Sequence, residues 1–228
     1  MKQKYKIIYL LNFIAIYLLI SGSSCNNGYL YNPALNLPIE IAKKNDIQIS
    51  GYISAAPEAL PSQRQKSTSI AAYGLLRFSP ADDYLFETSY LCDLSDINNQ
   101  YKRQNLSFSI LSNFYHNNND YHLGLKVNYQ RSWGIGDGGE GVGIQLIGQL
   151  PKIQSLRPYF GFGFAYGGKT NEWNLQNGFG IVSNFGLSFK IKEIYFINAE
   201  LIPIIQINRV DNITHGIISA NIGTGIYF

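Results

Sequence analysis

Three histidines are the residues best suited to acid–base chemistry in this chain of 228 residues, and one of them has neighbours that could complete a hydrolytic group. His215 follows Asp211 by four residues and precedes Ser219 by four. A histidine between a carboxylate and a hydroxyl is the group that activates a serine nucleophile. In a strand, however, Ser219 lies two steps deeper than His215. We therefore predict no catalytic residue and interpret His215 as a solvated side chain, with a hydrolase using His215 as the alternative.

The other candidates for metal, nucleotide or cofactor chemistry lack the spacing that such sites need. His116 and His122 flank an Asn-rich turn and form no metal-binding pattern with a Cys or Asp pair. The segment Gly134-Ile-Gly-Asp-Gly-Gly-Glu-Gly-Val-Gly143 has no Lys-Ser or Lys-Thr pair and no following helix, so it does not match a phosphate-binding loop. Its Asp-Gly-Gly turn is typical of a hairpin. We predict no metal and no cofactor.

The charge balance gives no support for a nucleic-acid partner. The chain has 18 Lys and Arg residues and 15 Asp and Glu residues. Three of the lysines and none of the acids lie in Met1–Lys6, so the rest of the chain is balanced. Cys25 and Cys92 are the two cysteines, which is too few for a disulfide framework.

Residues 1–24 have the pattern of a secretory signal peptide. Met1–Lys6 is basic, Ile7–Ile20 is almost entirely apolar, and small residues precede Cys25. The apolar run is too short to span a membrane comfortably as a helix. Leu19–Cys25 resembles the end of a lipoprotein signal, although Gly22 stands where a large aliphatic residue is expected. This resemblance implies acylation of Cys25 as the first mature residue, with ordinary signal cleavage nearby as the alternative.

Beyond residue 45 the chain consists of segments in which apolar residues alternate with small or polar ones. Phe160, Phe162, Phe164 and Tyr166, for example, alternate with glycine and alanine. A period of two indicates strands with one apolar face. We predict ten strands, most of them near the length that a tilted transmembrane strand needs: Asp46–Ala56, Ser67–Phe78, Tyr84–Asp93, Asn105–His116, Tyr121–Trp133, Val142–Leu150, Arg157–Gly167, Gly178–Lys190, Ile194–Ile207 and Gly216–Phe228.

These segments predict an all-β fold: a transmembrane antiparallel up-and-down β-barrel over residues 46–228, with ten strands, or eight as the second choice. The connections after odd-numbered strands are long and polar, and most of the others are short, as in outer-membrane barrels. A soluble barrel would carry charge on its outward face. Here only 14% of the residues are charged, and large aromatic residues occupy the apolar face, which suits lipid.

Five charged residues are predicted to project into the barrel interior: Arg77, Glu87, Lys126, Lys190 and Glu200. A ten-stranded barrel is narrow, so side chains should largely fill it. We therefore expect a packed, ion-paired lumen, with a channel for small solutes lined by these charges as the alternative.

Both ends of the mature chain carry a family resemblance. Tyr31-Asn-Pro33 and Asn36-Leu-Pro38 follow Cys25 and lead through Lys43-Lys44 into the first strand. This arrangement resembles the tether of a family of Bacteroidetes outer-membrane β-barrel lipoproteins. The alternating last strand, which stops at Tyr227-Phe228, resembles the closing strand of outer-membrane barrels, where a terminal Phe belongs to the assembly signal.

The resemblance implies a place in the bacterial outer membrane, residues 25–45 as a lipidated periplasmic tether, and contact with membrane lipid and the barrel assembly machinery. It brings no activity with it. We therefore expect a non-enzymatic structural or surface-interaction protein, with a narrow porin-like channel as the alternative within transport. The sequence does not indicate an external ligand.

Overall fold

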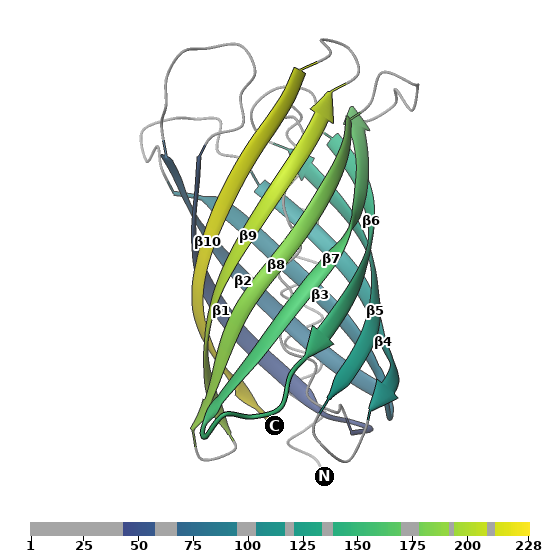
Figure 1. The fold of residues 1–228 in the computed structure, drawn as a ribbon, viewed down its shortest axis with the longest axis vertical. Coiled ribbons are helices and arrows are strands. Elements are labelled where there is room, and N and C mark those ends of the chain that lie inside the picture. Colours follow the sequence, from purple (N-terminus) through teal and green to yellow (C-terminus); the bar gives the residue numbers. More distant parts are fainter. Residues whose placement is uncertain are drawn as a thin grey trace.

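Ten strands close into an antiparallel barrel in a computed structural model of the chain (Figure 1). The structure describes residues 43–57, 68–94, 104–116, 121–133, 139–169, 178–191, 194–208 and 213–228. Each strand pairs with its neighbours in the chain, and the first pairs with the last. The strands are β1 (Ile47–Pro57), β2 (Thr68–Ala81), β3 (Tyr84–Asp93), β4 (Gln104–His116), β5 (His122–Trp133), β6 (Gly139–Gln149), β7 (Leu156–Lys169), β8 (Gly178–Ile191), β9 (Tyr195–Asn208) and β10 (Ile213–Tyr227).

The prediction of ten strands is confirmed, and the eight-strand alternative is wrong. The boundaries differ most where a strand continues past the apolar band. β2 continues to Ala81 instead of ending at Phe78, β6 begins at Gly139 instead of Val142, and β10 begins at Ile213 instead of Gly216. The backbone ladder extends through glycine and polar residues there, whereas the alternation of side chains that reveals a strand in the sequence has already ended.

The two faces of the barrel wall differ sharply in polarity. Small polar side chains face inward and are buried, among them Ser50, Asn105, Ser107, Asn128, Gln145, Asn184, Asn198 and Asn221. The outward side chains of the middle of the strands are large and apolar, and each is between 42% and 59% exposed: Ile53, Phe86, Phe108, Ile110, Val127, Ile144, Leu146, Phe162, Phe164, Phe185, Leu187, Leu201, Ile205 and Ile222. A soluble barrel has the opposite arrangement, so the exterior is suited to lipid.

Aromatic side chains with a polar group gather toward both ends of this apolar band. At the end with the short turns, Tyr84, Tyr115, Tyr121 and Tyr195 are between 41% and 52% exposed. Tyr90, Tyr129, Trp133 and Tyr166 lie in the parts of β3, β5 and β7 that approach the other end. Tyr and Trp are enriched at the two membrane–water interfaces, because each ring is apolar and carries one polar atom. The girdles therefore mark a membrane slab between them. Among the described residues, no helix is long and apolar enough to cross a membrane.

Pairing of β1 with β10 closes the barrel, and Phe228 lies at the short-turn end of this seam (Figure 1). Phe228 donates its N–H to the carbonyl of Ile47 at 2.8 Å, and the Ile47 N–H returns a bond of 3.3 Å. The ring of Tyr227 packs against Phe196 with the ring centroids 5.0 Å apart. The terminal aromatic pair thus lies at the seam between the first and last strands.

The barrel interior as the candidate functional site

Four charged side chains from four strands are buried inside the barrel: Arg77 from β2, Glu87 from β3, Lys126 from β5 and Glu200 from β9. None of the four residues is more than 5% exposed. Their positions follow from the strand alternation, because each lies on the face opposite to the lipid-facing side chains of its own strand. Two positive and two negative charges balance within this set.

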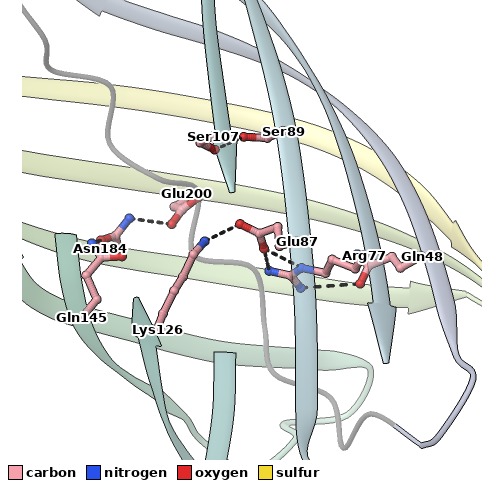
Figure 2. A network of polar contacts seen from close by, with 9 residues as sticks. All are labelled: Gln48, Arg77, Glu87, Ser89, Ser107, Lys126, Gln145, Asn184 and Glu200. Atoms are coloured by element: carbon pink, nitrogen blue, oxygen red, sulfur yellow. Dashed lines mark hydrogen bonds and ion pairs between the residues drawn. The ribbon is translucent and has the colours of Figure 1, made fainter. Parts of the chain in front are cut away.

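Glu87 joins the two cations (Figure 2). Its Oε2 accepts from Arg77 Nε at 2.7 Å and lies 2.7 Å from Arg77 Nη2. Its Oε1 accepts from Lys126 Nζ at 2.5 Å. Arg77 also approaches the side-chain oxygen of Gln48 on β1, at 3.5 Å. Each carboxylate oxygen of Glu87 is therefore held by a different cation, as a buried carboxylate requires.

Side-chain amides extend these buried polar contacts to β6, β8 and β9 (Figure 2). Gln145 Nε2 donates to Asn184 Oδ1 at 3.4 Å, and Asn184 Nδ2 donates to Glu200 Oε1 at 2.8 Å. Gln145 lies directly opposite Lys126 in the β5–β6 ladder. Glu200 also attracts Lys126 electrostatically. Seven residues, one from each of β1, β2, β3, β5, β6, β8 and β9, thus form a buried polar set. We call this set the polar layer: Gln48, Arg77, Glu87, Lys126, Gln145, Asn184 and Glu200.

Two apolar clusters flank the polar layer along the barrel axis. On the side of the long loops, buried apolar side chains from five strands pack together: Tyr52, Ala71, Tyr73, Leu75, Leu91, Val182 and Ile202. On the side of the short turns, Leu85, Leu111 and Ile147 pack together. Along β3, for example, the inward face carries Leu85, Glu87, Ser89 and Leu91 in order. Apolar side chains thus lie beyond the charges in both directions along the axis, on β1, β2, β3, β8 and β9 toward the long loops and on β3, β4 and β6 toward the short turns.

Buried aromatic rings occupy further space in the interior. Tyr52 and Tyr159 are 4% and 2% exposed, and the Tyr52 hydroxyl accepts from Asn198 Nδ2 at 3.0 Å. Opposite each ring the neighbouring strand has a glycine, Gly223 for Tyr52 and Gly186 for Tyr159. A Cβ at either glycine would overlap the ring. Glycine on the facing strand thus makes room for a large inward side chain.

The other residues singled out from the sequence lie apart from the polar layer. Lys190 is half-buried near the short-turn end, where its Nζ lies 5.0 Å from the centroid of the Tyr227 ring. His122 is buried, and its ring stacks on exposed His116 with the centroids 6.4 Å apart. Among the described residues, no group of three or more His, Cys, Asp or Glu side chains is placed to hold a metal ion.

Of the alternative hydrolytic group formed by Asp211, His215 and Ser219, the structure describes only the side chain of Ser219. The Ser219 hydroxyl is buried 3.1 Å from the hydroxyl of Ser54, and it also donates to Asn221 Oδ1 at 3.5 Å. The backbone of His215 pairs with Gln206, but its side chain lies outside the described residues. Asp211, Cys25, residues 26–42 of the tether and the segments between odd and even strands at the long-loop end lie outside them as well.

Two features of the interior were missed from the sequence. Arg157 on β7 is a further buried charge, only 8% exposed, and shares the inward parity of Tyr159. The alternation that places Tyr159 inside the barrel also places Arg157 there, so the sequence pattern could have identified Arg157. The apolar clusters were also missed, because leucines such as Leu85 and Leu91 on a mostly polar face were not weighed as packing residues.

Comparison with known proteins finds architectural likeness only. No protein-family model matches the chain, and no curated protein matches it. Among solved structures, the N-terminal β-barrel domain of Pseudomonas aeruginosa OprF is 16% identical with a TM-score of 0.39, and the match covers 82% of this chain and 100% of that one. Neisserial surface protein A is 12% identical with a TM-score of 0.36, covering 80% and 94%. The outer membrane protease OmpT from Escherichia coli is 10% identical with a TM-score of 0.40, covering 84% and 99%. No activity follows from likenesses at this level.

The apolar exterior between two aromatic girdles decides the class of this protein. It is a transmembrane β-barrel of the outer-membrane type. An even number of antiparallel strands closed without an edge is the form that bacterial outer-membrane proteins take, because closure satisfies every backbone hydrogen bond within the lipid. The bacterial outer membrane is therefore the location of this barrel.

Proposed function

We propose that this outer-membrane barrel has a closed interior and a non-enzymatic role, structural or in surface interaction, exerted through the segments at its long-loop end. The observation that supports this proposal is the position of the polar layer between two buried apolar clusters. Its charges are bound to one another rather than presented to solvent. The barrel wall then serves as a rigid support for whatever the outer segments contact.

Ion conduction needs a continuous path along which water or polar groups replace the hydration shell of the ion. Apolar constrictions oppose such a path by excluding water. Here an ion would have to pass two apolar clusters and also displace Arg77 or Lys126 from Glu87. Separating a buried charge from its partner leaves that charge uncompensated, at a cost of several kcal/mol. We therefore expect a plugged barrel rather than a pore.

Planar-bilayer recording tests this proposal. The wild-type protein should show no stable single-channel conductance. The narrow-channel alternative instead predicts a steady conductance whose ion selectivity changes in Lys126→Glu. Lys152→Glu is the matched control, because Lys152 is exposed in the turn between β6 and β7 and the same charge reversal there leaves the interior intact. Steady wild-type conductance that responds to Lys126→Glu and not to Lys152→Glu would overturn the closed barrel.

The enzyme alternative has a separate test. Purified protein should not hydrolyse peptides or lipids above the rate of a sample unfolded by boiling. Turnover that disappears in His215→Ala and survives in His116→Ala would establish the hydrolase and remove the non-enzymatic role.

We also propose that the chain is a Bacteroidetes-type barrel lipoprotein with a signal peptide over residues 1–24 and an acylated Cys25. The tether sequence between Cys25 and Lys44 supports this proposal. The final Tyr227-Phe228, which lies at the barrel seam, supports delivery by the barrel assembly machinery. An acyl chain at Cys25 would be a second membrane anchor in addition to the barrel itself.

A further inference from the structure

An aromatic and polar cluster lies on the lipid-facing surface at the long-loop end of β3, β4 and β5. Gln104 Oε1 accepts from the indole Nε1 of Trp133 at 2.7 Å and from the Tyr90 hydroxyl at 2.9 Å. The two aromatic rings lie 6.5 Å apart between centroids. With its oxygen satisfied by both rings, Gln104 retains its amide N–H₂ group as a donor. The shared acceptor thus fixes two rings and a donor at the membrane interface.

A cation lies beside this cluster on the same surface. Arg131 is two residues before Trp133 on β5, and its side chain is 55% exposed. Its partner across the β5–β6 ladder is Glu140, but the separation from Arg131 Nε to Glu140 Oε1 is 3.9 Å, longer than a hydrogen bond. Glu140 also makes a side-chain hydrogen bond with Tyr129. Glu140 therefore compensates Arg131 only loosely, and the Arg131 side chain stays more than half exposed.

Apolar columns run from this cluster toward the middle of the membrane. Ile110, Val127 and Ile144 lie opposite one another on β4, β5 and β6 on the outer surface, and each is between 46% and 50% exposed. A ligand held at Arg131 by a phosphate would place any attached acyl chains along these columns. The surface combines a cation, an amide donor, interfacial rings and an apolar strip, which matches an anionic lipid head group with its tails.

We infer that this rim patch, composed of Tyr90, Gln104, Tyr129, Arg131, Trp133 and Glu140, binds a phosphorylated glycolipid of the outer leaflet. Arg131 engages the phosphate with a charge-assisted hydrogen bond, and Gln104 and Trp133 contact the sugar face of the head group. Outer-membrane barrels turn their longer loops outward, which places the long-loop end of this barrel in the outer leaflet. The inference therefore rests on the outer-membrane placement given above. Glu140 competes with the phosphate for Arg131.

Binding of diphosphorylated lipid A to the folded barrel in detergent, measured by native mass spectrometry, tests the patch. Arg131→Gln should weaken binding about tenfold, as expected when one charge-assisted hydrogen bond is lost. Glu140→Gln should tighten binding, because it releases Arg131. Lys152→Gln removes the same charge at the opposite end of the barrel and should leave binding within about twofold of wild type. Compact unheated bands on gels verify that each variant is folded.

Three outcomes would overturn the inference. Equal losses for Arg131→Gln and Lys152→Gln would mean that net charge alone attracts the lipid. Unchanged binding in Arg131→Gln would remove the patch altogether. Binding of dephosphorylated lipid A or of phosphatidylglycerol as tight as that of diphosphorylated lipid A would remove the phosphorylated glycolipid as the ligand. Membrane fractionation tests the location separately: a barrel found in another membrane with Arg131-dependent binding intact would overturn only its location.

Discussion

Tyr159 lies directly opposite Gly186 in the β7–β8 ladder, and its ring occupies the space that a side chain at position 186 would need. The same relationship joins Tyr52 to Gly223 across the seam between β1 and β10. In both pairs the tyrosine is buried inside the barrel. In these two pairs, the absence of a side chain on the adjacent strand makes room for the large inward ring.

Gly186→Ala should destabilise the barrel by about 1–3 kcal/mol, because the added methyl group overpacks against the Tyr159 ring. Gly74→Ala is the matched control, since a Cβ at Gly74 on β2 meets no atom within 4 Å. That substitution should be neutral or slightly stabilising, because glycine is unfavourable within a strand. The urea midpoint at which the compact gel band of unheated protein disappears measures both changes. Equal effects at the two positions would contradict the packing argument.

Glu87→Gln should destabilise the barrel by about 3–5 kcal/mol, because it leaves Arg77 and Lys126 buried without their shared carboxylate. Glu140→Gln removes a carboxylate from a loose ion pair on the outer surface and should cost no more than about 1 kcal/mol. Urea unfolding in lipid vesicles compares the two variants. Adding Lys126→Met to Glu87→Gln restores the charge balance with Glu200 and should recover part of the loss. A double variant no more stable than Glu87→Gln alone would show that charge compensation is not the cause.

Ile222→Arg should cost about 2–4 kcal/mol if position 222 lies near the bilayer midplane. Ile222 is 58% exposed on the outward face in the middle of β10. Tyr195→Arg, at the start of β9 in the aromatic girdle, should cost about 0–1 kcal/mol, because a charge near the interface reaches water. Reversible unfolding in vesicles measures both. Similar costs at the two depths would argue against the assigned membrane slab.

Cys25→Ala should abolish incorporation of radioactive palmitate while leaving a barrel that migrates as a compact species before boiling. The reason is that acylation needs the thiol of Cys25, whereas the ten strands lie wholly beyond it. Cys92→Ala is the control, because Cys92 lies within β3. Equal labelling of wild type and Cys25→Ala would remove the lipid anchor and leave the barrel unaffected.

Much of the architecture can be predicted from the local alternation of apolar residues with small or polar ones. The inward parity of Glu87 and Lys126, and the outward parity of Phe162 and Ile222, could be assigned because successive side chains of a strand must point to opposite faces. The number and order of the strands follow from the same periodicity and from the turns between them. The ends of β6 and β10 could not be placed, because glycine and polar residues carry the backbone ladder without an alternating signal.

Only the tertiary structure decided which inward residues meet. Arg77 and Glu87 are neighbours across one tight hairpin, which the sequence nearly determines. Contact between Glu87 and Lys126, and the chain from Gln145 through Asn184 to Glu200, depend on the stagger of strands around a closed barrel. Parity assigns a residue to the interior but not to a level along the axis. The stagger sets that level, and it is a property of all ten ladders together.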